Sequence, residues 1–244
     1  ITGSAADGFV VTNTHVPGTT TVTATKVWDD QDDLLGMRDD VTLHLLGTVD
    51  GQTVYYDAEG KTIDADATGD DLTVTWANVP AKDGGETIAY TVVEDAIFGY
   101  VPTVKTLDNA DASDTAINLQ VTNKLTATPE YIAATKEWDD ADDQDGLRPD
   151  SVTFVLLQKN VTTGKVVEYG DPVKVAADET GEWIYIWTDL PYEIDGVPVL
   201  YSVAEKMGDE MAEDYTSQVI ATAPGEFTVV NTHTPETTTI EVTK

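Results

Sequence analysis

An asparagine and a lysine recur at one fixed spacing along this chain, and this recurrence constrains the fold more than any other feature. The two residues are thirteen positions apart in three pairs: Asn13 and Lys26, Asn123 and Lys136, Asn231 and Lys244. The flanking text also recurs, since residues 9–26 read FVVTNTHVPGTTTVTATK and residues 227–244 read FTVVNTHTPETTTIEVTK. Successive pairs are 108 to 110 residues apart, which is the length of a whole domain and too long for a solenoid unit. The sequence therefore predicts a tandem array of domains.

The repeat period divides the chain into two complete repeats and two terminal pieces. We expect residues 1–16 to be the terminal strand of a preceding repeat, 17–125 the first repeat, 126–233 the second repeat, and 234–244 the first strand of a following repeat. The connecting segments are short and Thr-rich, and each contains a proline: Pro17, Pro129 and Pro235. This composition favours extended and fairly stiff backbone. We therefore expect a rod-like array that belongs to a longer protein.

The charge of the chain excludes one class of partner. The 13 Lys and Arg residues against 45 Asp and Glu residues give a formal net charge of −32. Such a chain cannot bind nucleic acid by neutralising phosphates, and its self-repulsion leads us to expect a monomer. No run of about 18 apolar residues is present, so we also expect no membrane contact in this part of the protein.

Residue types that hold metals or form disulfides are scarce. The absence of cysteine removes disulfides, thiol catalysis and cysteine-based zinc sites. The three histidines, His15, His44 and His233, are too few and too scattered to predict a metal cluster. We expect neither a metal nor a cofactor.

Two acidic turns, at residues 29–33 and 139–145, carry the hard oxygen ligands that calcium prefers. Their spacing does not fit an EF-hand loop, because Ala141 and Val152 would fall at the first and last ligand positions. We interpret them as solvated turns, and a looser calcium site is the alternative.

Short segments in which apolar and polar residues alternate dominate both repeats, and this alternation is typical of β-strands. Examples are Val22-Ala24-Lys26-Trp28, Val41-Leu43-Leu45, Ile88-Tyr90-Val92 and Leu119-Val121-Asn123, which recur as Ile132-Ala134-Lys136-Trp138, Val152-Phe154-Leu156, Val199-Tyr201-Val203 and Phe227-Val229-Asn231. Residues 206–214 form the one candidate for a helical turn. The pattern predicts an all-β fold of two antiparallel β-sandwiches with Greek-key connections.

Alternation also turns three polar residues of each repeat toward the core. Residues two apart share a face of a strand, so Lys26 lies on the same face as Val22 and Ala24. The same rule applies to the asparagine that ends the last strand and to the glutamate of each Y-x-V-x-E segment. The inward residues are Lys26, Glu94 and Asn123 in the first repeat and Lys136, Glu205 and Asn231 in the second.

Buried charges of this kind cost several kcal/mol unless they are paired or neutralised. One interpretation is a buried ion pair whose hydrogen bonds are completed by the amide. The other is covalent: burial lowers the pKa of the lysine from about 10.4 and raises that of the glutamate. The neutral amine then attacks the asparagine side chain while the glutamate relays protons and ammonia leaves. The residues alone leave both interpretations open.

Several motifs occur in the same order in both repeats. The first strand and its acidic turn read KVWDD at residues 26–30 and KEWDD at residues 136–140, and each turn ends at an arginine, Arg38 or Arg148. W-x-x-x-P segments follow at 76–80 and 187–191, Y-x-V-x-E segments at 90–94 and 201–205, and the closing asparagines come last. This order resembles the Cna B-type domain of Gram-positive surface proteins, and the resemblance spans both repeats almost end to end.

The resemblance implies an immunoglobulin-like sandwich whose first and last strands are adjacent and joined by a Lys-Asn isopeptide bond. It assigns the cross-links to Lys26 with Asn123 and to Lys136 with Asn231, and the catalytic role to Glu94 and Glu205. Asn13 and Lys244 are repeat equivalents without a partner in this sequence, and we expect them to remain unreacted.

These expectations describe a structural stalk repeat of a cell-wall-anchored adhesin or fimbrial protein, extracellular and resistant to force and proteolysis. The chain is not expected to be an enzyme, because each bond forms once and consumes its own side chains. Its expected partners are neighbouring repeats of the same polypeptide. The alternatives are a pilus-shaft subunit or an adhesion module that binds a host surface protein or glycan. For the latter, Trp183 is the tryptophan we expect to be exposed, since it lacks an obvious counterpart in the first repeat.

Overall fold

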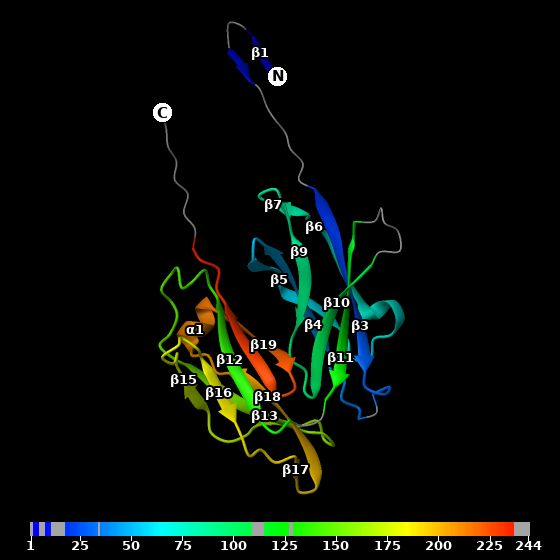
Figure 1. Ribbon diagram of the computed structural model, residues 1–244, viewed down its shortest axis with the longest axis vertical. Helices are drawn as coiled ribbons and strands as arrows, with labels where there is room; N and C mark the ends of the chain where they lie inside the picture. The colour runs from blue at the N-terminus through cyan, green and yellow to red at the C-terminus, as the bar shows by residue number, and fades with distance from the viewer. Residues whose placement is uncertain are drawn as a thin grey trace.

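Two β-sandwiches lie side by side in this protein (Figure 1). The computed structural model describes residues 2–4, 8–10, 18–33, 35–108, 115–126 and 129–236. A short antiparallel pair, β1 (Thr2–Ser4) and β2 (Gly8–Val10), precedes the first sandwich. The expectation of an all-β fold of two immunoglobulin-like sandwiches is confirmed.

The first sandwich consists of a four-stranded and a three-stranded sheet. The four-stranded sheet has the order β10 (Tyr100–Leu107), β11 (Ile117–Leu125), β3 (Thr19–Asp29) and β6 (Thr73–Pro80). The facing sheet has the order β5 (Gln52–Ile63), β4 (Val41–Val49) and β9 (Ala89–Glu94). A 3-10 helix, η1 (Gly69–Leu72), and a small hairpin of β7 (Lys82–Asp83) and β8 (Glu86–Thr87) lie in the connections.

The second sandwich repeats this plan. Its first sheet has the order β16 (Ile184–Trp187), β12 (Ile132–Asp139), β20 (Glu226–Thr232) and β19 (Thr216–Ala223). The facing sheet contains β14 (Val166–Glu168), β13 (Val152–Asn160), β18 (Val197–Glu205) and β17 (Glu193–Ile194), and β15 (Val173–Val175) also pairs with β13. The single helical turn expected near residues 206–214 is the helix α1 (Asp209–Asp214).

The first and last strands of each sandwich are parallel neighbours, and their register is the same in both repeats. Val121 pairs with Lys26 in the first sandwich, and Val229 pairs with Lys136 in the second. Each closing asparagine lies opposite a tryptophan, Asn123 opposite Trp28 and Asn231 opposite Trp138. The lysine and the asparagine of a repeat therefore project from adjacent strands on the same face of one sheet.

Alternating apolar residues form a separate core in each sandwich. Fully buried members include Val22, Ala24, Leu43, Leu45, Val92 and Val121 in the first, and Ile132, Ala134, Phe154, Leu156, Val203 and Val229 in the second. Trp183, expected to be exposed, instead packs against the second core, with its ring 5.6 Å from that of Trp138 in an edge-to-face arrangement. Trp183 immediately precedes β16 and is half-buried, because part of its ring contacts Trp138.

The two sandwiches are folded back against each other, so the expectation of a rod-like pair is wrong for these two repeats. The backbone N–H of Ala96 donates to the carbonyl of Val219 at 2.7 Å, and the Gln218 side chain donates to Asp95 at 2.8 Å. Leu200 of the second repeat packs into the first core. Figure 1 accordingly shows the start of β3 and the end of β20 at the same end of the molecule.

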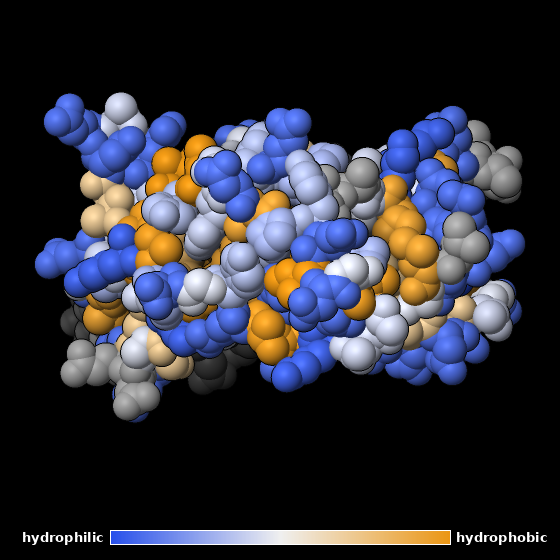
Figure 2. Space-filling view, turned by 90° about the horizontal axis from the view of Figure 1, so that it is seen from below, coloured by the Kyte–Doolittle hydropathy of each residue, from blue (hydrophilic) through white to orange (hydrophobic). Residues whose placement is uncertain are grey.

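Polar contacts strengthen this interface. Lys159 of the second repeat lies 3.5 Å from Asp39 and 5.6 Å from the ring centroid of Phe98, both in the first repeat. Seen from the end where the two repeats are connected, hydrophobic residues form small separate groups among hydrophilic ones (Figure 2). These contacts hold the two repeats side by side.

Candidate functional site

The three inward polar residues of the first repeat meet in its core. Lys26 on β3, Glu94 at the end of β9 and Asn123 on β11 are 1%, 2% and 0% exposed. The Nζ atom of Lys26 lies 2.5 Å from Oε2 of Glu94, and Nδ2 of Asn123 donates to Oε1 of the same carboxyl at 2.5 Å. Because Glu94 comes from the facing sheet, it bridges the two residues across the sandwich.

The second repeat brings the equivalent residues together in a looser arrangement. Lys136 is 4% exposed and Asn231 is fully buried. Nζ of Lys136 lies 3.8 Å from Oε2 of Glu205, and Nδ2 of Asn231 donates to Oε1 of Glu205 at 3.3 Å. The lysine donates instead to two backbone carbonyls, those of Glu137 at 2.9 Å and Val229 at 3.2 Å.

Burial shifts these groups toward their neutral forms. Loss of hydration lowers the pKa of Lys26 to about 8 and that of Lys136 to about 7, although the nearby glutamate opposes the shift in each case. Loss of hydration also raises the pKa of Glu94 and of Glu205, against the influence of the lysine. A neutral amine is a nucleophile and a protonated carboxyl is a proton donor, so burial favours the reactive form of each group.

The asparagine side chain has an unsatisfied oxygen in both clusters. Within the part of the chain that the structure describes, Oδ1 of Asn123 and Oδ1 of Asn231 are buried and accept no hydrogen bond. A buried acceptor without a donor costs about 1 to 3 kcal/mol. Rotation of the amide group by a half-turn about the Cβ–Cγ bond would exchange Nδ2 and Oδ1. Oδ1 would then face the glutamate and could accept a hydrogen bond from its protonated carboxyl.

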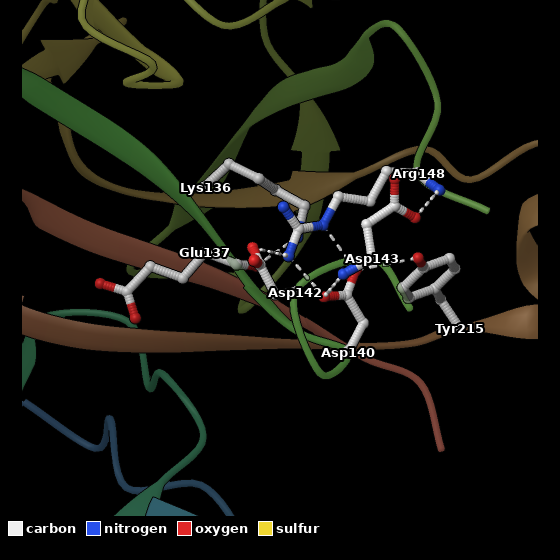
Figure 3. A network of polar contacts seen from close by, with 7 residues as sticks. All are labelled: Lys136, Glu137, Asp140, Asp142, Asp143, Arg148 and Tyr215. Carbon is white, nitrogen blue, oxygen red and sulfur yellow. Dashed lines mark hydrogen bonds and ion pairs between the residues drawn. The ribbon is translucent and has the colours of Figure 1, made fainter. Parts of the chain in front are cut away.

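A second polar network, which we did not infer from the sequence, lies beside each cluster, and Figure 3 shows that of the second repeat. In the second repeat Arg148 donates to both oxygens of Asp140, at 2.5 and 2.6 Å, and the hydroxyl of Tyr215 donates to the same carboxylate at 3.0 Å. The guanidinium and the Lys136 amine both lie near the Trp138 ring, 5.7 and 4.2 Å from its centroid. The network therefore helps to fix the position of the Trp138 ring, which lies against the Lys136 amine.

The first repeat contains the same network, formed by Asp30, Arg38 and Tyr100. Arg38 donates to both oxygens of Asp30 at 2.7 and 2.8 Å, and Tyr100 donates at 3.0 Å. Hydrogen bonds from Arg38 hold the pKa of Asp30 at about 2. The arginine that ends each acidic turn was a signal in the sequence, because a bidentate partner suits a carboxylate that cannot stay solvated.

These contacts bear on the calcium alternative for the acidic turns. The inward aspartates, Asp30 and Asp140, already bind a guanidinium. Asp33 and Asp143 accept backbone N–H groups, from Met37 and Arg38 in the first turn and from Arg148 in the second. Among the described residues, no group of three or more His, Cys, Asp or Glu side chains is placed to hold a metal ion.

Other candidate residues lie elsewhere. Asn13 and Lys244 are outside the described residues. His44 lies between the Ala58 carbonyl and Asp95, whereas His233 contacts Asp145 near the end of the second repeat. No helix in the described part of the chain has the length and apolar character needed to cross a membrane.

Comparison with known proteins gives matches over both repeats. Residues 22–124 and 132–232 each match the Cna protein B-type domain family. The collagen adhesin of Staphylococcus aureus is 33% identical over 233 residues, which cover 95% of this chain and 17% of that protein. The chain thus spans a small part of this curated relative.

Solved structures of surface proteins are also similar. A single B repeat unit (B1) of the collagen binding surface protein of Staphylococcus aureus is 29% identical, with 89% of this chain and 100% of that chain covered and a TM-score of 0.36. The full-length major pilin RrgB from Streptococcus pneumoniae is 15% identical, with 90% and 49% covered and a TM-score of 0.29. The two family matches coincide with the two sandwiches, and the chain belongs to the Cna protein B-type domain family, of which it contains two tandem copies.

Proposed function

We propose that this chain is a stalk segment of a surface adhesin or pilin, and that each repeat closes on itself through a Lys-Asn isopeptide bond. The observation that carries the proposal is the buried cluster of one lysine, one glutamate and one asparagine, present in both repeats at equivalent positions. The bonds would join Lys26 to Asn123 and Lys136 to Asn231.

The chemistry requires only groups that the cluster contains. The neutral lysine amine attacks the side-chain carbonyl carbon of the asparagine, and a new C–N bond forms as the bond to the amide nitrogen breaks. The protonated glutamate gives its proton to the carbonyl oxygen as the amine attacks, and the resulting carboxylate takes a proton from the amine and passes it to the departing nitrogen. That nitrogen leaves as ammonia, and the proton on the oxygen returns to the glutamate as the carbonyl forms again. Fixing both reactants in one core replaces a bimolecular encounter, which can lower the barrier by about 7 to 11 kcal/mol.

The position of the bond suits a protein that carries load. Because β3 and β11 are parallel neighbours, tension on the chain enters at the start of β3 and leaves at the end of β11. A bond from Lys26 to Asn123 would carry this tension directly and bypass the residues between them. By analogy with a disulfide, closing a loop of this length would stabilise the fold by about 4 to 5 kcal/mol, and no reductant would open it.

The relatives support the surface location. They include an adhesin and pilins of Gram-positive bacteria, so we place the parent protein on the extracellular face, anchored to the cell wall. In this setting the neighbouring repeats of the same polypeptide are the immediate partners, and the chain is a monomer. The reaction occurs once in each repeat, so the chain is not an enzyme acting on external substrates.

The intact mass of the denatured chain tests this proposal. Two isopeptide bonds remove two ammonia molecules, which lowers the mass by about 34 Da from the encoded value. Tandem mass spectrometry of digested protein should find branched peptides that join Lys26 to Asn123 and Lys136 to Asn231. A chain at its full encoded mass would leave two buried ion pairs and would remove the covalent proposal.

A second candidate function is adhesion by the second repeat. Ile184 and Ile186 on the edge strand β16 are 44% and 50% exposed, whereas the first repeat has Thr73 and Thr75, in that order, at the equivalent positions of β6. The curated relative is a collagen adhesin, so immobilised collagen is the first probe. Binding that is lost in the Ile184→Thr/Ile186→Thr double variant would favour adhesion, and no binding would leave the stalk function.

A further inference from the structure

The two clusters contain the same three residue types in the same register, but a fourth residue distinguishes them. In the second repeat Ser217 on β19 lies opposite Asn231, and its hydroxyl donates to Oε2 of Glu205 at 3.1 Å. In the first repeat the equivalent position on β10, opposite Asn123, is Pro102. A proline side chain has no hydrogen-bond donor, so Glu94 receives no such bond.

The hydroxyl occupies the oxygen that the lysine uses in the other repeat. Oε2 of Glu94 accepts from Lys26 at 2.5 Å, whereas Oε2 of Glu205 accepts from Ser217 and lies 3.8 Å from Nζ of Lys136. Lys136 donates to the carbonyls of Glu137 and Val229 instead. The amine of the second repeat is thus displaced from the group that must take its proton.

The hydrogen bond also changes which form of the glutamate is favoured. A hydroxyl that donates to a carboxylate stabilises its charged form, whereas the reaction begins with a protonated carboxyl that polarises the asparagine carbonyl. Ser217 is itself exposed, so its hydroxyl can keep this bond without a burial cost of its own.

We propose that Ser217 is a positioning residue that slows isopeptide formation in the second repeat, so that one chain closes its first repeat before its second. This inference rests on the proposed function, because it concerns the rate of the same reaction. In each repeat the amine nitrogen gains the bond to the asparagine side-chain carbon, and that carbon loses ammonia. Ser217 neither gains nor loses atoms; it acts through Glu205.

The rates can be measured in the full chain with one cluster silenced at a time. The Asn123→Ala variant leaves only the second cluster reactive, and the Asn231→Ala variant leaves only the first. Each chain is dissolved from inclusion bodies in denaturant and refolded at about pH 5.5, where the lysine amine is charged and cannot attack. A jump to neutral pH starts the reaction from folded protein, and acid-quenched samples are weighed for the loss of about 17 Da.

We expect the second repeat to react about tenfold more slowly than the first. The free energy of a hydrogen bond to a charged group is large enough to account for a factor of this size, because the bond stabilises the unreactive carboxylate. Ser217→Ala should bring its rate close to that of the first repeat, and Ser217→Thr should keep it slow. The reciprocal change Pro102→Ser should slow the first repeat. Tryptophan fluorescence at the end of the refolding step identifies any variant that fails to fold.

The pH profile separates this role from a merely structural one. The rate falls as pH rises through the pKa of the glutamate, because the protonated carboxyl is the reactive form. Ser217→Ala removes a bond that favours the anion, so the alkaline limb should move to higher pH while the acid limb, set by the lysine, stays in place. The Ser217→Thr variant should retain the original alkaline limb.

The outcomes are distinguishable from failure of the proposed function. If the parent chain never loses mass after the pH jump, the isopeptide proposal and this inference both fail. If both repeats lose about 17 Da at equal rates, or if Ser217→Ala changes neither the rate nor the alkaline limb, the isopeptide proposal stands and the role of Ser217 is overturned.

Discussion

Nζ of Lys26 lies 2.5 Å from Oε2 of Glu94, although the two residues belong to strands of opposite sheets. The lysine enters the core from β3 and the glutamate enters from β9, and both side chains are almost completely buried. A contact of this kind across a sandwich replaces apolar packing with two groups that must be paired or neutral. The second repeat brings the equivalent lysine and glutamate together from opposite sheets as well, but at 3.8 Å.

Removing either glutamate should prevent one bond. Glu94→Gln should raise the intact mass by about 17 Da over the parent, apart from the substitution itself, and Glu205→Gln should do the same. Each variant should also lose about 4 to 5 kcal/mol of unfolding free energy in its own repeat, because the loop is no longer closed. Guanidinium unfolding followed by tryptophan fluorescence measures the loss. The exposed Glu59→Gln serves as the control, and equal stability of all three variants would contradict the prediction.

Arg148→Met should destabilise the second repeat by about 3 kcal/mol, because it leaves the Asp140 carboxylate buried without its partner. Adding Asp140→Asn removes that charge and should restore part of the loss. Urea unfolding of the single and double variants measures the difference. Arg38→Met is the matched control and should affect the first repeat instead. The idea fails if the double variant is no more stable than the single one.

The histidine at the interface predicts a pH dependence. The Nδ1 and Nε2 atoms of His44 face the Ala58 carbonyl and the Asp95 carboxylate at 2.9 and 3.1 Å, and Asp95 also accepts from Gln218 of the second repeat. Asp95 and the nearby Asp57 raise the pKa of His44 against the effect of its burial. A raised folded-state pKa means that the stabilisation is complete below the unfolded value of about 6.5 and is lost as pH rises through the folded value.

Urea unfolding at several pH values above about 6 measures this dependence. The parent chain should lose stability relative to His44→Gln as pH rises, since the glutamine does not titrate. Comparing the two chains cancels the titration of groups that they share. A constant difference between them across this range would show that His44 does not change its charge there.

Leu200→Asp should separate the two sandwiches. Leu200 is 9% exposed, belongs to β18 of the second repeat and packs into the first core, so a charge there opposes the side-by-side arrangement. The loss should be about 2 to 5 kcal/mol, as for other disruptions of a buried leucine. Small-angle X-ray scattering should report a larger radius of gyration. Tyr192→Asp, at a side chain that is 53% exposed, is the control, and an unchanged radius in Leu200→Asp would refute the role of this contact.

Periodicity in the sequence was sufficient to predict which polar residues face the core. The two-residue alternation of a strand fixes the face of Lys26, Glu94 and Asn123 relative to their apolar neighbours, and all three are buried. It could not predict that the three would meet, because a face is shared by many residues and the distance between sheets depends on every side chain in the core.

The sequence by itself determined the repeat length, the all-β fold and the inward direction of each polar residue, since these follow from local spacing along single strands. The tertiary structure decided what each residue contacts. The contact of Lys26 with Glu94, the hydrogen bond from Tyr215 to Asp140 and the packing of Leu200 into the first core each join elements that are distant in the sequence. Such contacts depend on strand register and on packing between sheets and repeats, which alternation along one strand does not specify.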